Sequence, residues 1–215
     1  MHVVDKILRH APLIPGNKRR SFGAHISVTT TAFTSCVTER QQFLIATNTA
    51  LLEQAINLLE RLSPAIYRVS PHGLEPQRAS AHFRHIIEFY ECLLDGRAMS
   101  HVDYGSRRRD PDLERDPRGA SARIRGIVER LTDATDLRFD SVLWVRMENA
   151  DAFGGPATFL MSSVGREIQT LASHTVHHFA LIAMILRLHG LELDPGFGVA
   201  PSTLSFWSTR TACAR

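Results

Sequence analysis

The sequence predicts an all-α protein, a four-helix bundle with a short β-hairpin inserted between the third and the last helix. Four segments, at about 38–62, 77–95, 117–134 and 163–188, repeat apolar residues at the 3.6-residue period of an amphipathic helix. Stretches rich in Pro, Gly and charged residues separate these segments. Between the third and the fourth, SVLWVRM and ATFLMSS are rich in β-forming residues, and the turn-like NADAFGGP joins them.

The first predicted helix has the sequence TERQQFLIATNTALLEQAINLLERL, whose apolar residues recur at helical spacing. Pro64, Pro71 and Pro76 then indicate a loop before the second helix begins. The second helix is predicted to end at Gly96, because glycine suits the left-handed position that follows many helices. The fourth helix begins near Ser163 and ends before Gly190 for the same reason.

The connection HVDYGSRRRDPDLERDPRG, between the second and third helices, is strongly charged and contains two prolines and two glycines. We therefore expect a long surface connection there and no regular element. Its arginines, Arg107, Arg108 and Arg109, suit the binding of a carboxylate on an anionic substrate. A solvated loop with internal Arg–Asp pairs is the favoured interpretation.

Length and charge pattern predict the domain organisation. A chain of 215 residues suits a single core, which we place at 38–206 and expect to be followed by a tail at 207–215. Residues 1–37 are basic and rich in Ser and Thr, and they show no apolar period. We expect a disordered extension there, with a transit-like sequence as the alternative.

Composition argues against several classes of partner. Basic residues exceed acidic ones mainly before residue 40, so the +3 net charge leaves no basic stripe on the bundle for nucleic acid. The longest apolar stretch, Phe179 to Leu186, is too short for a membrane span. Cys36, Cys92 and Cys213 are odd in number and far apart, which suits a reducing compartment and predicts a cytoplasmic protein.

The histidines carry the main functional signal. His174 and His178 are separated by one helical turn and by only about 40° around the helix axis, so both imidazoles can meet at one point. A catalytic zinc-type site takes three protein ligands, and the second helix offers His82 or His85 as the third. His85 is preferred because core-facing residues follow it.

The HxxxH pattern also has a simpler interpretation. An isolated HxxxH pair is more often a pair of ordinary core or surface histidines. Here a second amphipathic helix also carries histidine, and buried imidazoles without a partner are costly, which favours metal binding. The HExxH protease motif is excluded because residue 175 is Thr. Cys92 is expected to be an inert buried thiol, and Glu167 to stabilise the start of the last helix.

Several blocks of the sequence resemble the DinB-like family in order and spacing, over about 38–206. The blocks are AHFRHIIEFYECLLDG, DYGSRRRDPDLERDP, SSVGREIQTLASHTVHHFALIAMILRLHG and FGVAPSTL. The resemblance implies a four-helix bundle in which His85, His174 and His178 bind a divalent metal ion, zinc or nickel. The chain departs from the family at Glu88, where relatives often have Asp, and at Phe89, where they often have His. Phe179-Ala180-Leu181 also stands where they often have Arg-Gly-Gln.

The resemblance further implies a function. Some members of the family are metal-dependent transferases that activate a low-molecular-weight thiol, so we expect a metal-dependent enzyme that activates a small thiol or water. The alternative is a non-catalytic, stress-associated metal-binding protein or a helical interaction protein. FGVAPSTLSFW, near the C-terminus, is expected to return across the bundle, where it would cover either the metal site or the face of a homodimer.

Overall fold

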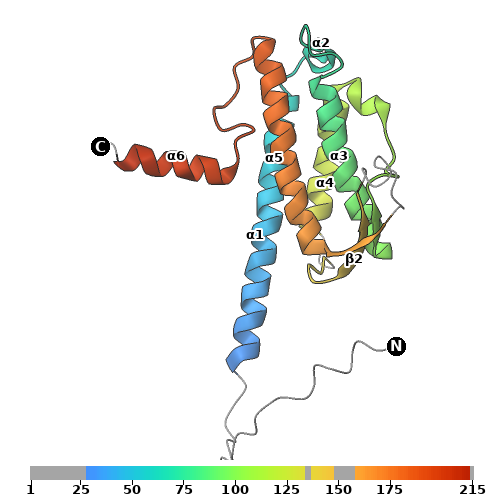
Figure 1. Cartoon of the computed structure of the whole chain (residues 1–215), viewed down its shortest axis with the longest axis vertical. Coiled ribbons are helices and arrows are strands. Elements are labelled where there is room, and N and C mark those ends of the chain that lie inside the picture. Colours follow the sequence, from blue (N-terminus) through green and yellow to red (C-terminus); the bar gives the residue numbers. More distant parts are fainter. Residues whose placement is uncertain (1–27, 134–136, 148–157, 214–215) are drawn as a thin grey trace, which may run out of the picture. The chain divides into compact units, whose positions relative to one another are not determined.

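The computed structural model describes residues 28–133, 137–147 and 158–213, and most of the expected extension 1–37 lies outside them. The described residues form a mostly helical fold with a small three-stranded sheet (Figure 1). This confirms the mostly α prediction. The helices are α1 (Val28–Leu59), α2 (Pro64–Arg68), α3 (Ala79–Gly96), α4 (Pro117–Thr132), α5 (Val164–Leu188) and α6 (Pro201–Cys213).

The start of the first helix differs from the prediction, since α1 begins at Val28 rather than near residue 38. The polar run of Thr residues there does not prevent a helix, although it lacks the apolar period on which the prediction depended. The chain divides into two compact units, Met1–Cys36 and Val37–Arg215. All the features described below belong to the second unit.

The predicted loop after α1 contains the short helix α2. Ser63 caps its start by accepting a hydrogen bond from the Ile66 amide, and Pro64 occupies the first turn, where its missing N–H costs nothing. Tyr67 of α2 is fully buried and donates from its hydroxyl to the Leu113 carbonyl at 2.7 Å. This bond attaches α2 to the 3-10 helix Pro111–Glu114, which the sequence analysis placed in a surface connection.

α3 packs against both α5 and α4 and is the centre of the core (Figure 1). The contact forms because each helix turns its apolar face inward, which removes large side chains from water. The buried residues of α3 include Phe83, Ile86, Ile87, Tyr90 and Leu93, and those of α5 include Ile168, Leu171, Phe179 and Ile182. The core therefore fixes how these two helices face each other.

α5 begins and ends as the sequence predicts. Ser163 accepts a hydrogen bond from the Arg166 amide at the start. At the end, the Gly190 amide bonds to the Arg187 carbonyl and the Leu191 amide to the Leu186 carbonyl. These two bonds form a Schellman motif, in which Gly190 adopts φ +79°.

Among the described helices, α5 is the one that is long and apolar enough to cross a membrane, judged by length and composition alone. A core helix of a soluble protein meets the same criterion. The apolar side chains of α5, such as Leu171 and Ile182, are buried within the described structure. Length and composition alone are therefore a weak indication of a membrane span.

The sheet has the order β1-β2-β3 and contains the predicted hairpin strands. β2 (Val142–Arg146) pairs antiparallel with β3 (Leu160–Ser163), as expected, and residues 148–157 between them lie outside the described residues. β1 (His101–Asp103) was not predicted and pairs parallel with β2. The expectation that 101–119 forms only a surface connection is therefore wrong. The physical reason is that Val102 and Tyr104 are buried and alternate with more exposed polar residues, as in a strand with one face in the core.

Gly96 serves a different purpose from the predicted one. Its φ of −73° is right-handed, so the turn does not require glycine. A Cβ at this position would lie 2.3 Å from the carbonyl oxygen of His101. Gly96 therefore permits the close approach of the chain that leads into β1.

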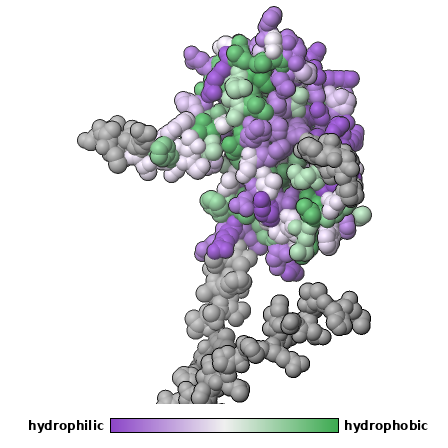
Figure 2. All heavy atoms as spheres, in the orientation of Figure 1, coloured by the Kyte–Doolittle hydropathy of each residue, from purple (hydrophilic) through white to green (hydrophobic). Residues whose placement is uncertain are grey.

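The C-terminal segment returns onto α5. The Phe197 ring stacks on the Phe179 ring at 4.7 Å, and Gly198 lies against the backbone of Phe179 and Ala180. α6 follows and extends to Cys213, so it includes most of the stretch expected as a C-terminal tail, 207–215. Figure 2 shows apolar residues interspersed with polar ones on the visible face, and the exposed hydrophobic side chains include Phe206 and Trp207 of α6.

Two glycines test this arrangement as a matched pair. Gly190 and Gly198 both have φ near +78°, but only Gly198 has backbone atoms of α5 where a Cβ would lie, at 2.7 Å. Gly190→Ala should destabilise the fold by about 1 kcal/mol for the left-handed backbone alone. Gly198→Ala should cost about 3 kcal/mol, since overpacking adds to the same strain. Equal losses in urea unfolding would contradict the packing of this segment on α5.

Candidate metal centre

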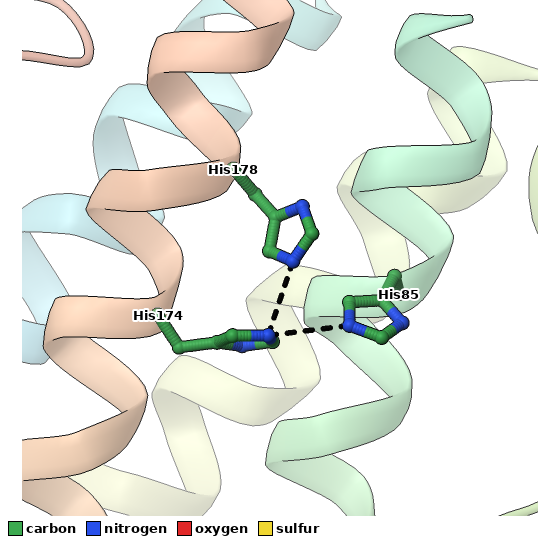
Figure 3. Close-up of side chains that lie close together, drawn as sticks. All are labelled: His85, His174 and His178. Carbon is green, nitrogen blue, oxygen red and sulfur yellow. Dashed lines mark hydrogen bonds between the residues drawn. The ribbon is translucent and has the colours of Figure 1, made fainter. Parts of the chain in front are cut away.

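Three imidazoles from α3 and α5 point toward one another (Figure 3). His174 and His178 lie one turn apart on α5, and His85 faces them from α3. Nε2 of His174 lies 3.2 Å from Nε2 of His85 and 3.0 Å from Nε2 of His178. The structure thus brings together the three histidines that the sequence analysis selected, with ligand atoms all within 4.8 Å of one another.

A single two-centre hydrogen bond does not account for both contacts at Nε2 of His174. An imidazole nitrogen offers either one N–H or one lone pair, yet two neighbouring nitrogens approach Nε2 of His174. Three nitrogens around a tetrahedral zinc ion would lie about 3.3 Å apart, given Zn–N distances near 2.0–2.1 Å. The two separations at Nε2 of His174 are close to that value and all three ligand atoms lie within 4.8 Å of one another, so the three side chains could hold a divalent ion.

Burial keeps two of these imidazoles in the neutral form, which is the form that can bind a metal ion. The pKa of His85 is lowered to about 3, first by burial and then by the neighbouring His174 and Arg107. The pKa of His178 is also far below its usual range, again first because of burial and then because of His174. Both imidazoles are therefore neutral at pH 7 and keep a lone pair for coordination.

His82, the residue rejected as a ligand, lies beside the cluster. Its Nδ1 is 3.0 Å from Nδ1 of His178, on the side of that ring away from the other ligands. Metal-binding histidines usually have their second nitrogen hydrogen-bonded, which fixes the ring orientation. His82 can supply this bond to His178. His177, on the same turn of α5, is exposed.

A buried carboxylate, Glu88, lies one turn after His85 on α3. Its side chain is only 1% exposed, and both of its oxygens accept hydrogen bonds from Arg84 at 2.9 Å. The Asp110 amide donates to it at 2.8 Å, and Nε of Arg107 lies 3.3 Å away. These contacts compensate the burial of the charge, which would otherwise be costly. The i, i+4 spacing of Arg84 and Glu88 on one helix is the sequence pattern that could have predicted this ion pair.

Arg107 corrects the expectation of a fully solvated arginine run. Its side chain is 4% exposed, whereas Arg108 and Arg109 are exposed as expected. Nη2 of Arg107 lies 3.1 Å from Nδ1 of His85, and Nη1 donates to the Tyr104 carbonyl at 2.8 Å. Nothing in three consecutive arginines indicates which one turns inward, so the sequence alone could not identify this contact.

Phe89 separates the imidazoles from a second polar pair. Its ring centre is 4.5 Å from that of His85 and 4.4 Å from that of His174, and it stacks on Tyr104 at 4.7 Å. The Tyr104 hydroxyl donates to Glu167 at 3.0 Å, as does Ser162 at 2.6 Å. Glu167 lies in the first turn of α5, as expected, and its carboxylate also bonds to β3 and to the residue after β1.

Cys92 agrees with the expectation of an inert thiol. Its Sγ donates to the Asp103 carbonyl at 3.4 Å. Burial, and after it the nearby Asp103 carboxylate, raise the pKa of the thiol to about 11. At neutral pH the group stays protonated and is a poor metal ligand.

Comparisons with known proteins do not assign the chain to a family. No model of a protein family matches it, and no solved structure matches it. FK506-binding protein 5 of Rhizopus delemar is 33% identical to it over 103 residues, which cover 48% of this chain and 26% of that protein. The chain thus matches about a quarter of the length of this curated relative.

The lowered pKa values predict how the stability of the metal-free protein depends on pH. Because the unfolded chain binds protons near pH 6.5 and folded His85 only near pH 3, the free energy of unfolding should fall as pH drops from 6.5 toward 3. Above about pH 7 this contribution should be constant. Urea unfolding with a chelator present, at pH 7.5 and 4.5, measures the effect.

The control separates these imidazoles from other titrating groups. The double variant His85→Gln, His178→Gln should lose stability less steeply toward pH 4.5 than the parent protein. His72→Gln, at an exposed position, should keep the parent slope. Identical slopes in all three proteins would show that the buried imidazoles do not contribute.

Proposed function

We propose that this protein is a DinB-like metal-binding protein, a metal-dependent enzyme whose three histidines hold a divalent zinc or nickel ion to activate a small thiol or water. The observation that carries the proposal is the approach of two imidazole nitrogens to Nε2 of His174, because one two-centre hydrogen bond can explain only one of them. In the same proposal α1, α3, α4 and α5 are the helices of a DinB-like four-helix bundle, an arrangement in which facing helices build metal sites.

The composition of the ligand set supports a catalytic site. Three imidazole ligands leave a fourth position for an exogenous group, as in catalytic zinc sites, whereas structural sites close with four protein ligands. All three histidines are only partly buried. When bound, a divalent ion supplies Lewis acidity, which lowers the pKa of a thiol or water at that position.

The residues around the ligands would orient and shield them. His82 holds the outer nitrogen of His178, and Phe89 covers His85 and His174 with an apolar ring. This side of the cluster therefore excludes water and keeps the electrostatic interactions of the ligands strong. The proposed partner is a small molecule, a low-molecular-weight thiol, in the cytoplasm. The non-catalytic alternative keeps the same ligands and differs only in lacking turnover.

The first test is metal content. Protein purified without a His-tag should contain about one zinc or nickel ion per chain, measured by plasma mass spectrometry. His85→Ala, His174→Ala and His178→Ala should each remove most of it, because one of three ligands is lost. His177→Ala is the control on the same helix and should retain the ion. Full metal content in all three ligand variants would refute the site.

The second test is turnover. Zinc- or nickel-loaded protein should accelerate the reaction of a small thiol with an aryl halide, followed by product absorbance. His85→Ala should abolish the acceleration. His82→Ala should reduce metal affinity about tenfold, as expected for a group that orients a ligand, and should recover activity at saturating metal. One bound ion without any turnover would favour the non-catalytic alternative.

A further inference from the structure

In the contact between Arg107 and His85 the arginine is the donor, whereas the outer nitrogen of a metal-binding histidine usually donates. The guanidinium reaches Nδ1 of His85 at 3.1 Å, on the side of the ring away from the other imidazoles. Arginine has N–H donors and no acceptor, and it stays charged in proteins. Nδ1 of His85 must therefore accept this bond, so the proton of the neutral ring is on Nε2.

Metal binding requires the opposite arrangement. A lone pair on Nε2 of His85 is needed for coordination, so the ring proton moves to Nδ1 by exchange with water. An N–H on Nδ1 would then face an N–H of Arg107, and two donors cannot form a hydrogen bond. The hydrogen bond from Arg107 to Nδ1 of His85 is therefore incompatible with a neutral His85 that binds a metal ion through Nε2.

We propose that Arg107 is a positioning residue that couples metal binding at His85 to the conformation of segment 104–110. Its guanidinium leaves Nδ1 of His85 when that ring takes the ion. The inference rests on the proposed metal site and adds a conformational response to it. His178 shows no such conflict, because its outer nitrogen faces His82, an imidazole that can either donate or accept.

The contacts of Arg107 explain why the response extends along this segment. Nη1 holds the Tyr104 carbonyl, and Nε lies beside Glu88, whose carboxylate also accepts from the Asp110 amide. A shift of the guanidinium therefore disturbs bonds at both ends of segment 104–110. Glu88 is an acceptor within the reach of Arg107, so the cation keeps a charged partner as it moves.

The first experiment uses the unaltered protein. Nitrogen-15 NMR of the histidine rings, with a chelator present, should show His85 protonated on Nε2, and zinc addition should move the proton to Nδ1. Amide hydrogen exchange in 104–110 should become faster with zinc, while exchange in α4 does not. Protonation of Nδ1 in the metal-free protein, or zinc binding without faster exchange in 104–110, overturns the coupling.

The second experiment compares two neighbouring arginines. Arg107→Gln supplies a carbonyl that can accept from Nδ1–H of His85, so zinc affinity, measured by chelator competition, should rise at least severalfold. Arg108→Gln, at an exposed position, should leave it unchanged. If Arg107 merely supports the ligand, its loss should weaken binding about 10- to 100-fold, and that result overturns the proposal. Thermal unfolding of both variants checks that they fold.

The two proposals fail in different ways. If the parent protein binds neither zinc nor nickel in the competition assay, the metal site and the coupling are both refuted. If zinc binds with the expected stoichiometry but Arg107→Gln weakens it, the metal site stands and only the coupling is refuted. The proton position on metal-free His85 is measured independently of either result.

Discussion

The packing of α3 against α5 is the contact on which the other features depend. Each helix carries part of the histidine cluster on the side that it turns toward the other, next to the apolar residues that hold the pair together. A displacement of one helix by a single residue would rotate its side chains by about 100° and separate the imidazoles. The hydrophobic core therefore determines the geometry of the polar site.

Burial of charge is the second constraint on this region. Glu88 lies in the interior one turn from His85, and its burial is tolerated because two guanidinium groups and a backbone amide surround it. This requirement draws Arg107 inward and fixes the segment after β1 against α3. The charged segment is thus part of the wall of the site, and its conformation depends on a carboxylate within the helix.

Sequence patterns predicted the long helices and the three histidines because both depend on short-range periodicity. His174 and His178 share one helix face by spacing alone, and α5 has clear start and stop signals at Ser163 and Gly190. The choice of His85 over His82 also agrees with the observed cluster. The start of α1 and the presence of α6 were missed because neither has a strong apolar face.

The missed contacts are long-range. β1 is only three residues long and pairs with a strand some forty residues later, so no local pattern identifies it. The inward turn of Arg107 depends on Glu88, which is remote in sequence, and the bond of Tyr104 to Glu167 depends on the folded position of α5. Such pairs become visible only when the chain is folded.

Phe89 has a consequence for the movement of protons. It lies between the imidazoles and the buried Tyr104–Glu167 pair, and its ring has no group that can donate or accept a proton. A Grotthuss-type relay cannot pass through this ring, so Glu167 is insulated from the histidines despite being on the same helix. On the other side of the cluster, His82 lies beside His178 and His177 is exposed to solvent, so titratable groups connect the imidazoles to water there.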